Sequence, residues 1–582
     1  MFIIKTERNW LIDLALLTIL LLFFYLLGLG AYPLFTPDEG RYTEVAREML
    51  VTGDYITPRV NGVVFLDKPI LYYWLQAIAL QLFGANEWAA RFSPAMLGIF
   101  GVLFTYVCGR KLYDRRTGLF AAIVLATSPL YFGGAHYANL DLEVAVWISA
   151  AMLCFITAVQ PLLLNKPTAN QRFLFAAYGF AALAFLTKGL IGLVFPAMVA
   201  GCWLLLMGRL HFLTKLRVLS GLLLFIVIVL PWYLLAQQAN PEFLHYFFVG
   251  QQFERFLSAN DFNNKTVVWF YLPVILIGFF PWTVFLCQAF NQAIRSVWQD
   301  KQQHAITCFL LLWAVLIFIF FSLPRSKLIG YILPVLPALA LLVGRYLALL
   351  STQPAIQKTA ISLSVSPWVG RITRASVIFM LLAIAFAALL IAAAYYQWVD
   401  FLPGFIPYLW GMAAIFFLGG MGALFIWRKK TIMPLFILSA TTSAAALWVL
   451  TFGASYLNTK STKALAQQLQ SILQPQDEVI NYFSFYQDAP FYLQRQITLV
   501  ADWHASQVTR RDNWIRELSH SKVFQQPDTW LISEAVFWQR WESNRRVFVL
   551  MKVNDLPQFK RQAKYFFTIG QANNIILVTN QK

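Results

Sequence analysis

The sequence predicts an α-helical polytopic membrane protein with a small α/β domain at its C-terminal end. The 582-residue chain is 59% hydrophobic and only 12% charged, with a mean hydropathy of +0.61. A soluble protein carries about 25% charged residues. Beyond residue 456 the composition becomes that of a soluble protein. We therefore expect a membrane domain over 1–456 and a soluble α/β domain over 457–582.

Long apolar runs define the expected membrane spans. The first run, "LIDLALLTILLLFFYLLGLGA", is long enough to cross about 30 Å of hydrocarbon. It is too long, and its end too acidic, for a cleaved signal peptide. Thirteen spans are expected, at residues 10–30, 89–109, 117–133, 142–160, 173–188, 190–207, 217–236, 267–288, 304–323, 331–350, 375–397, 406–427 and 432–453.

Basic residues predict the orientation of these spans. With the N-terminus in the cytoplasm, all seven cytoplasmic segments are basic, as the positive-inside rule requires. The residues are Lys5/Arg8, Arg110/Lys111/Arg115/Arg116, Lys166/Arg172, Arg209/Lys215/Arg217, Arg295/Lys301, Lys358/Arg371/Arg374 and Arg428/Lys429/Lys430. The C-terminal domain is then expected outside. Most of the net charge of +18 follows from this topology, so we expect no nucleic-acid partner.

Acidic residues gather on the opposite side, where 13 of the 17 in the membrane domain are expected. Acids contribute little to orientation, so this clustering indicates an outward-facing polar site. Two long outer loops, 31–88 and 237–266, would carry most of it. Within the first loop, the apolar segment "ILYYWLQAIALQLFG" predicts an interfacial helix with Tyr72, Tyr73 and Trp74 at headgroup depth.

The C-terminal domain alternates strand-like and helix-like segments, as an α/β fold does. The strand-like runs are "EVINYF", "ITLV", "TWLIS", "RVFVLM" and "NIILVT". The helix-like runs are "STKALAQQLQSIL", "EAVFWQRWES" and "LPQFKRQA". The five cysteines all fall in expected spans, so no disulfide framework is visible.

The stretch "FTPDEGRYTEVAREML" begins the first outer helix and has two compatible interpretations. As local structure, Thr36 and Glu39 form a capping box, with Pro37 at the first helical position. As a reaction centre, Asp38 beside Arg41 offers a carboxylate that the helix N-terminus keeps ionised.

Two further motifs on the outer face each have a structural and a functional interpretation. "FLDKP" places Lys68 where it could bind a phosphate at headgroup level, or it is a solvated turn. In "YANLDLEV", Asn139 caps a span that begins near Asp141. The functional interpretation gains because Asp141 and Asp38 lie on the same face.

Cations from three outer segments suit a polyanion such as a lipid phosphate, although each alone could snorkel to the interface. They are Lys188 in "FLTKGL", Arg255 in "QQFERF", and Arg325 and Lys327 in "PRSKLIGY", which ends at Tyr331. The chain has no "GxxxxGK[ST]" motif, so no nucleotide cofactor is expected. It also has no His/Cys cluster with zinc spacing.

These residues, in this order, resemble the GT-C class of lipid-linked-sugar glycosyltransferases, of the protein O-mannosyltransferase and aminoarabinose transferase type. The resemblance covers nearly the whole chain. Its motifs are "PDEGRYTEVAREML", "GDYITPRVNG", "DKPILYYW", "FGANEWAAR", "YANLDL", "FLTKG" and "SKLIGYILPVLPALA".

The resemblance implies transfer of a sugar from undecaprenyl phosphate on the periplasmic face of the bacterial inner membrane. In the aminoarabinose branch the sugar is 4-amino-4-deoxy-L-arabinose and the acceptor is a lipid A phosphate. Such transfer lowers the negative surface charge and gives resistance to polymyxin and other cationic peptides. Membrane lipids are further expected partners.

The resemblance also assigns roles to individual residues. Asp38 and Asp141, with Glu39, would be catalytic. The donor phosphate would be bound by Arg41, Tyr42, Lys68, Tyr331, Arg255, Lys327 and Lys188. A divalent metal would lie near Asp38 and Asp67. The chain departs from the family pattern at three places: Asp67 replaces a Glu, Gln251 and Gln252 replace an acid and a histidine, and Leu142 replaces a Pro.

Other functions remain open from the residues alone. A related transferase could use galactosamine, glucose or mannose, with a lipid, glycan or protein acceptor. With a Ser/Thr hydroxyl acceptor, Asp38 would have to act as a base, whereas an anionic phosphate hardly needs one. A transporter of lipid-linked sugars is disfavoured by the absence of an inverted repeat. A structural scaffold would not explain the charges on the outer face.

Overall fold

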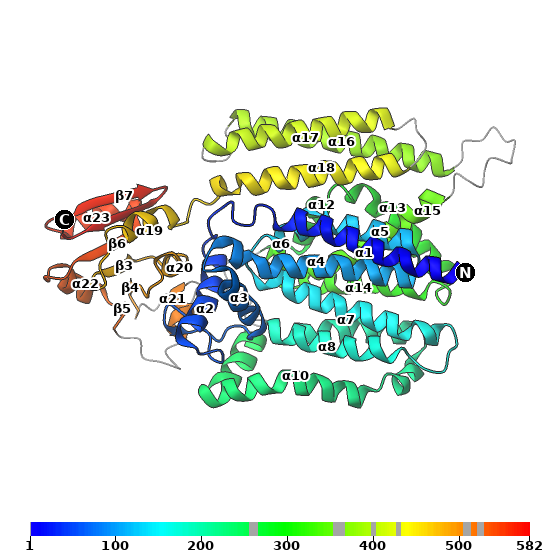
Figure 1. Ribbon diagram of the computed structural model, residues 1–582, viewed down its shortest axis with the longest axis horizontal. Coiled ribbons are helices and arrows are strands. Elements are labelled where there is room, and N and C mark those ends of the chain that lie inside the picture. Colours follow the sequence, from blue (N-terminus) through cyan, green and yellow to red (C-terminus); the bar gives the residue numbers. More distant parts are fainter. Residues whose placement is uncertain are drawn as a thin grey trace. The chain divides into compact units, whose positions relative to one another are not determined.

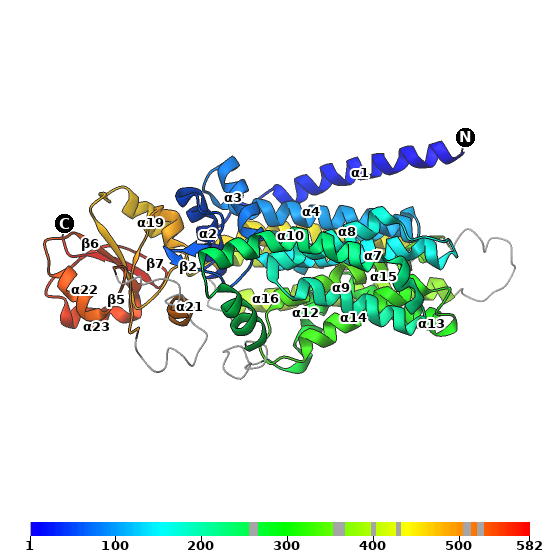
Figure 2. The ribbon, with the colours of Figure 1, turned by 90° about the horizontal axis from the view of Figure 1, so that it is seen from below.

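The computed structural model describes residues 2–254, 266–352, 367–396, 403–426, 432–503, 514–520 and 529–581 (Figure 1, Figure 2). The chain forms two compact units, each made of three segments. Unit 1 consists of Met1–Leu29, Pro94–Leu230 and Thr266–Leu457, and unit 2 of Gly30–Ser93, Pro231–Lys265 and Asn458–Lys582. These units cut the chain differently from the domain division expected at residue 456.

Unit 1 contains most of the apolar helices, and two of those named below extend into unit 2, over residues 87–93 and 231–239. They are α1 (Phe2–Leu26), α4 (Glu87–Leu112), α5 (Arg115–Ala126), α6 (Pro129–Ala135), α7 (Leu140–Leu163), α8 (Gln171–Lys188), α9 (Ile191–Leu206), α10 (Val218–Ala239), α12 (Tyr271–Gly278), α13 (Thr283–Gln299), α14 (Ala305–Ser322), α15 (Leu336–Thr352), α16 (Pro367–Tyr396), α17 (Ile406–Ile426) and α18 (Ile432–Gly453). Short 3₁₀ segments η1 (Leu210–Lys215), η3 (Val268–Phe270), η4 (Ile329–Val335), η7 (Pro403–Phe405) and η9 (Ala454–Leu457) connect some of them.

A helix occupies each of the thirteen positions expected to span the membrane. Among the described residues, eight helices are long and apolar enough to cross by themselves: α4, α7, α10, α14, α15 with η4, α16, α17 and α18. The number is ten if each of two bent helix pairs is counted as one span. The other expected spans correspond to α1, α8 and α9, which are shorter or less apolar. The chain is a multi-span membrane protein.

The bend between α5 and α6 shows how an interrupted span is stabilised. The two helices meet at 66°, at Thr127 and Ser128, just before Pro129. Two carbonyls at this break accept side-chain hydrogen bonds: Ala126 from the Tyr25 hydroxyl at 2.9 Å and Thr127 from the Ser443 hydroxyl at 2.6 Å. Backbone polar groups at membrane depth need such partners because no water is available there.

The expected span at 267–288 is a sharply bent helix pair, and the sequence did not predict the bend. α12 ends at Gly278 and α13 begins at Thr283, with an angle of 114° between them. Pro281 lies in the break, and a proline has no N–H to donate within a helix. Beyond the break, α13 is amphipathic, with six residues of the set Gln, Asn, Arg and Ser on one face.

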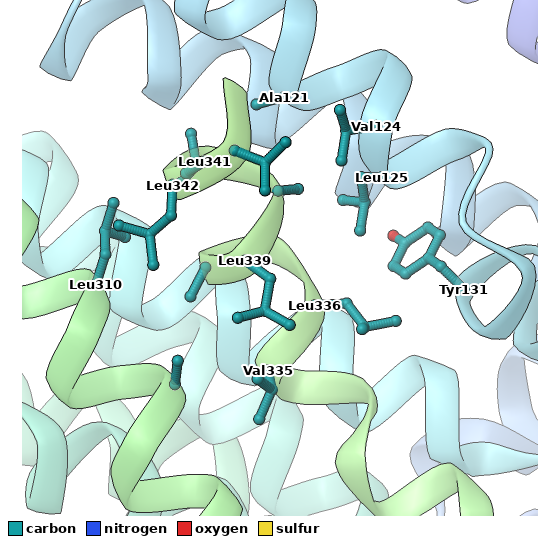
Figure 3. Packing of buried hydrophobic residues seen from close by; sticks show 14 of the residues in the cluster. Ala121, Val124, Leu125, Tyr131, Leu310, Val335, Leu336, Leu339, Leu341 and Leu342 are labelled. Atoms are coloured by element: carbon teal, nitrogen blue, oxygen red, sulfur yellow. The ribbon is translucent and has the colours of Figure 1, made fainter. Parts of the chain in front are cut away.

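Tight packing of α5 against α15 forms part of the core (Figure 3). Leu336, Leu339 and Leu342 of α15 are buried, as are Val124 and Leu125 of α5. The helices approach closely because a glycine of α15 faces α5. A Cβ at that position, residue 344, would lie 2.7 Å from the backbone N of Ala121. Small residues at helix contacts serve this purpose in membranes.

Unit 2 combines the first outer loop with the C-terminal α/β segment. Its elements are α2 (Asp38–Thr52), β1 (Arg59–Val60), β2 (Val63–Val64), α3 (Leu71–Phe83), the π-helix η2 (His245–Glu254), α19 (Lys463–Gln470), β3 (Glu478–Tyr482), α20 (Ala489–Leu493), β4 (Thr498–Val500), α21 (Trp514–His520), β5 (Leu531–Ile532), α22 (Glu534–Trp541), β6 (Val547–Lys552), η11 (Val553–Asp555), α23 (Leu556–Gln562), β7 (Phe567–Ala572) and β8 (Ile575–Thr579).

The C-terminal sheet has six strands in the order β5-β4-β3-β6-β8-β7. The first four strands in this order are parallel, and β8 is antiparallel to both of its neighbours. All five expected strands and all three expected helices of this segment are present, which confirms the α/β prediction. The sixth strand, β7, was missed because it is a partly exposed edge strand interrupted by Gly570.

A short hairpin, β1–β2, joins the first outer loop to the C-terminal segment. Its turn residues Asn61 and Gly62 both have positive φ, 53° and 76°, as a two-residue Asn-Gly turn requires. The Asn61 amide donates to the Ile497 carbonyl and its oxygen accepts from the Ile497 N–H, both at 2.8 Å. These paired hydrogen bonds connect residues 436 positions apart in the chain.

The expected apolar segment of the first outer loop forms the helix α3. Ile78 and Leu82 are exposed, as an interfacial helix requires. Tyr72 and Tyr73, which the sequence predicts at headgroup depth, are completely buried inside unit 2. Their rings pack against Tyr42 of α2 at centroid distances of 5.8 and 6.1 Å, so α2 covers this face of α3.

Candidate functional site

The first turn of α2 carries two of the candidate residues in direct contact. Arg41 donates from Nη2 to the Asp38 carboxylate at 2.7 Å. Spacing of three residues on a helix places such side chains on one face. The Asp38 side chain keeps 32% of its exposure, so its carboxylate remains accessible.

A second carboxylate, which sequence analysis did not single out, also binds Arg41. Arg41 Nη1 contacts both oxygens of Glu517 in α21, at 2.7 and 2.8 Å. The guanidinium also lies over the rings of Tyr42 and Phe65. Its Nε–H is buried and has no hydrogen-bond partner among the described residues. Arg41 therefore retains one donor that an additional acceptor could use.

Glu39, the neighbour of Asp38, has a different environment. Its carboxylate receives Arg91 Nε at 2.7 Å and Nη2 at 2.6 Å, and neither side chain is exposed. Arg91 also donates to the carbonyls of Tyr32 and Pro33. These contacts hold the segment before α2 in place and leave Glu39 away from solvent.

The expected Thr36 cap is absent. α2 begins at Asp38 with Pro37 in the cap position, and no side chain caps it. Instead, the Phe35 carbonyl accepts from the N–H groups of Glu39 and Gly40, and the Glu39 carboxylate accepts from the Phe35 N–H. The capping-box prediction was wrong for Thr36, because backbone contacts already satisfy the first turn.

Asp67 and Lys68 are less exposed than a solvated turn would be. Asp67 is buried and accepts a 2.5 Å hydrogen bond from the Tyr246 hydroxyl of η2. Lys68 is half-buried, and its ammonium donates to the Asp67 carbonyl at 3.1 Å. A tyrosine from the second outer loop thus holds the Asp67-Lys68 turn of the first.

Tyr73 lies at the centre of this part of unit 2. Its hydroxyl is buried and has no hydrogen-bond partner among the described residues. Burial raises its pKa well above the usual value. The charged or ionisable groups close enough to act on it are Tyr42, Arg41, Asp67 and Glu517. The structure therefore brings several of the predicted site residues of unit 2 together around one tyrosine.

A second cluster lies in unit 1. Asp141 in the first turn of α7 forms an ion pair with Lys188, the last residue of α8. The Asn139 side chain caps α7 by accepting from the Asp141 N–H at 3.0 Å, as the sequence predicted. The Lys188 ammonium lies 4.5 Å from the ring centroid of Tyr331. Three predicted residues, from α7, α8 and η4, are thus in contact.

Gly330 explains how Tyr331 reaches this ion pair. A Cβ at residue 330 would lie 2.4 Å from the Asp141 carboxylate oxygen Oδ2. The η4 backbone can approach Asp141 only because residue 330 has no side chain. Its position beside Tyr331 in "SKLIGY" was the available sequence signal, although the motif alone did not reveal the contact.

The remaining predicted cations are placed differently. Lys327 is buried, and its ammonium donates to the Pro324 carbonyl at 2.5 Å. This contact places Lys327 against the backbone just after α14. Arg255 lies outside the described residues.

The described residues contain no group of three or more His, Cys, Asp or Glu side chains arranged to hold a metal ion. Asp38 is bound by Arg41, and Asp67 by Tyr246. The expected metal ligands Asp38 and Asp67 therefore lack a third described partner of this kind, and we derive no chemical step through a metal.

Two family models match the chain. The dolichyl-phosphate-mannose-protein mannosyltransferase model matches residues 67–234, and the aminoarabinose transferase C-terminal domain model matches residues 465–580. The first match includes Lys68, Asp141 and Lys188. The second includes the whole six-stranded sheet.

Curated relatives carry a consistent description. The undecaprenyl phosphate-alpha-4-amino-4-deoxy-L-arabinose arabinosyl transferase of Aeromonas hydrophila is 34% identical over 333 residues, which cover 56% of this chain and 58% of that protein. Transferase 2 of the same description from Pseudomonas fluorescens is 34% identical over 362 residues, 62% of this chain and 60% of that protein. The alignments span less than two thirds of either relative.

Solved structures share the fold. ArnT from Cupriavidus metallidurans, bound to undecaprenyl phosphate, has a TM-score of 0.80 at 23% identity over 98% of both chains. The oligosaccharyltransferase AglB from Archaeoglobus fulgidus has a TM-score of 0.51 at 12% identity, over 96% of this chain and 71% of that one.

The fold therefore defines the class: a multi-span membrane protein with the GT-C glycosyltransferase fold, as the sequence motifs indicated. Within this class the resemblance to the ArnT-type aminoarabinose transferases is also confirmed. It rests on the C-terminal domain, the curated relatives and the fold shared with ArnT.

Proposed function

We propose that this chain transfers 4-amino-4-deoxy-L-arabinose from undecaprenyl phosphate to a phosphate of lipid A. The observation that carries the proposal is the Arg41 cluster on a chain with the ArnT fold. A guanidinium whose buried Nε–H has no hydrogen-bond partner among the described residues is suited to a phosphate, because the planar fork of arginine binds two phosphate oxygens through parallel hydrogen bonds.

The proposed reaction breaks the bond between sugar C1 and the phosphate oxygen of the donor and forms a bond from C1 to an oxygen of the acceptor phosphate. Negative charge builds on the departing undecaprenyl phosphate. Arg41, Tyr42 and Lys68 would stabilise this charge. The acceptor phosphate is already anionic, so Asp38 would orient it or stabilise positive charge on the sugar.

In the arrangement described here, the donor phosphate would compete with Glu517 for Arg41. Glu517 binds Nη1 with both oxygens, in the way that two oxygens of a phosphate would. Glu517 thus sets how readily Arg41 accepts a donor.

In unit 1, Asp141 and Tyr331 hold the Lys188 ammonium between a carboxylate and an aromatic ring. We propose that Asp141 fixes the position and balances the charge of Lys188, which is a candidate cation for an anionic group of a substrate. The proposed location is the bacterial inner membrane, with a cytoplasmic N-terminus and a periplasmic C-terminal segment. A periplasm-specific reporter fused after residue 456 should be active, and a silent one would reverse this orientation.

A second candidate acceptor is a protein hydroxyl, which the match to the mannosyltransferase family over residues 67–234 favours. Asp38 would then be the general base that accepts the proton of the attacking hydroxyl. The match of residues 465–580 to the aminoarabinose transferase domain favours lipid A.

The purified full-length protein in detergent provides the test. Donor and lipid A are mixed with the protein, and the product is followed by mass spectrometry. We expect the mass of one aminoarabinose added to lipid A, and none added to a Ser/Thr peptide. Transfer to the peptide alone would overturn the lipid A assignment. In cells, expression of the chain should raise resistance to polymyxin, since the modified surface is less negative.

A further inference from the structure

Unit 1 contains a polar cavity that the proposed transfer does not use. Its volume is about 710 Å³, within the range of small-ligand sites. α13, α15 and α16 contribute its walls. The lining residues are Gln288, Asn291, Gln292, Arg295, Ser296, Gln299, Tyr346, Arg374 and Ile378.

The polar residues of α13 in this cavity form one continuous stripe. Their spacing of three and four residues places them on a single helix face. A different face, with Phe285, Ala289 and Ala293, is buried in the core. Trp298 is 89% exposed and Ile294 is 50% exposed. An exposed tryptophan on an amphipathic helix is typical of the boundary between lipid and water.

The charge of the cavity selects for an anion. Arg295 and Arg374 contribute two guanidinium groups, and none of the described residues that line the cavity is acidic. The Tyr346 hydroxyl donates to the Gln288 side chain at 2.5 Å, which orients that amide. The Gln292 Oε1 atom is buried and has no hydrogen-bond partner among the residues that the structure describes. It can accept from a hydroxyl group of a ligand.

The cavity also lies at a membrane face. α14 crosses the membrane from Ala305 and α15 crosses back to Thr352, so these two ends lie on the same side. Tyr346 is near that end of α15, and Arg374 is near the beginning of the α16 span. In the orientation proposed above, this side faces the cytoplasm. Anionic lipids give that leaflet its negative surface.

We propose that this cavity binds the phosphate and the hydroxylated headgroup of an anionic membrane lipid of the phosphatidylglycerol type. The two arginines bind the phosphate, and the amides of α13 bind the headgroup hydroxyls. Ile378, which lines the cavity and is 39% exposed, lies against the first part of an acyl chain. The lipid is neither donor nor acceptor of the transferred sugar. The orientation proposed above decides only which leaflet of the membrane supplies this lipid.

Native mass spectrometry of the full-length protein tests this site. The protein is incorporated into nanodiscs that contain phosphatidylglycerol, phosphatidylethanolamine and phosphatidylcholine in equal amounts, and the retained lipid is identified. The variants are Arg295→Gln, Arg374→Gln and the double variant. Arg209→Gln is the matched control, because Arg209 bonds Gln302 at the same end of the bundle without lining the cavity.

We expect the wild type to retain phosphatidylglycerol in preference to the other two lipids. Each arginine substitution should weaken retention about five-fold, as expected for one cation near a lipid surface, while Arg209→Gln has no effect. Equal retention by the double variant would overturn the proposal. So would displacement of the lipid by millimolar inorganic phosphate, which would show a site for free phosphate. If the double variant does not fold, the single variants decide, with melting temperature as the folding control.

Discussion

Two arginines of unit 2 each bind an acid of α2, but in different environments. Arg91 and Glu39 are both completely buried, and each guanidinium nitrogen of Arg91 donates to Glu39 or to a backbone carbonyl. Arg41 binds Asp38 and Glu517, whose side chains keep 32% and 24% of their exposure. Its Nε–H has no partner among the described residues.

The difference separates an ion pair that holds the fold from one that can exchange partners. A buried pair leaves an uncompensated charge when either member is lost. A partly exposed pair contributes little to stability, since water can solvate its members. Adjacent residues of one helix, Glu39 and Asp38, therefore have separable roles, although the sequence suggested a catalytic role for both.

The largest expected effect is on stability, from Glu39→Gln. Arg91 would remain buried without a counter-charge, at a cost of about 3–5 kcal/mol. We expect low expression and a lower melting temperature in detergent. The double variant Glu39→Leu/Arg91→Met should recover part of the loss, because it buries no charge. A Glu39→Gln protein that melts like the wild type but fails to transfer sugar would instead make Glu39 a catalytic residue.

Asp38→Asn should reduce sugar transfer and leave the stability of the protein nearly unchanged. The carboxylate is partly exposed, so expression and melting temperature should remain near those of the wild type. Transfer should fall by about 100-fold, the scale on which one charge-stabilising group acts. Initial rates at saturating donor provide the measurement. Near-normal transfer would leave Asp38 with only the structural role of pairing with Arg41.

Asp488 is a carboxylate of unit 2 in a third kind of environment. Asp488 is buried and forms no ion pair among the described residues; it accepts from the Thr462 N–H and the Ser461 hydroxyl. Burial raises its pKa to about 6 from 3.8. The folded protein therefore holds this proton more tightly than the unfolded chain does. The resulting contribution to the free energy of unfolding is fully present below about pH 4 and is lost as the pH rises to about 6.

Asp488→Asn should therefore remove part of the pH dependence of melting. At 1.36 kcal/mol per pKa unit, the wild type should lose at most about 3 kcal/mol through this group between pH 4 and pH 7. Asparagine imitates the protonated form and keeps an oxygen for both hydrogen bonds. Thermal melts of both proteins at pH 5 and pH 7.5 measure the effect. Parallel changes in the two proteins would show that Asp488 does not titrate in this range.

The smallest effect is expected for Glu517→Gln, and it concerns donor binding. Without the second carboxylate, the donor phosphate has one competitor fewer at Arg41. Half-saturation should need about five-fold less donor, the effect of about 1 kcal/mol from a partly exposed pair, at an unchanged maximal rate. Glu542→Gln is the control, since Glu542 is exposed and pairs with Lys564. An unchanged donor dependence would remove Glu517 from the donor site.

The sequence predicted those parts of the fold that depend on local composition. Apolar runs located a helix at every expected span, and alternating segments located five of the six C-terminal strands. The two bends, near Pro129 and Pro281, were not predicted. The hydropathy of an apolar run is the same whether its helix is straight or interrupted. The thirteen spans expected from hydropathy remain a prediction beyond the eight to ten that the structure supports.

The candidate site was predictable only where a motif supplied both partners. Asp38 and Arg41 are three residues apart, so their contact follows from helix geometry. Arg41 and Glu517 are 476 positions apart, and nothing in "WIRELSH" distinguishes Glu517 from a solvated helix residue. Tyr246, which binds Asp67, was missed for the same reason. Long-range contacts depend on how segments meet, which a single sequence does not record.

The Asn61–Ile497 hydrogen bonds have a consequence for biosynthesis. At roughly 5–20 residues per second, a ribosome needs on the order of 20 to 90 seconds to translate the 436 positions between them. The first outer loop must spend this interval without the Ile497 backbone groups that satisfy the Asn61 side chain. A nascent chain released before residue 497 can complete many membrane helices but not this loop. Quality-control proteases would then recognise an incomplete chain by its first loop, which was synthesised long before the defect arose.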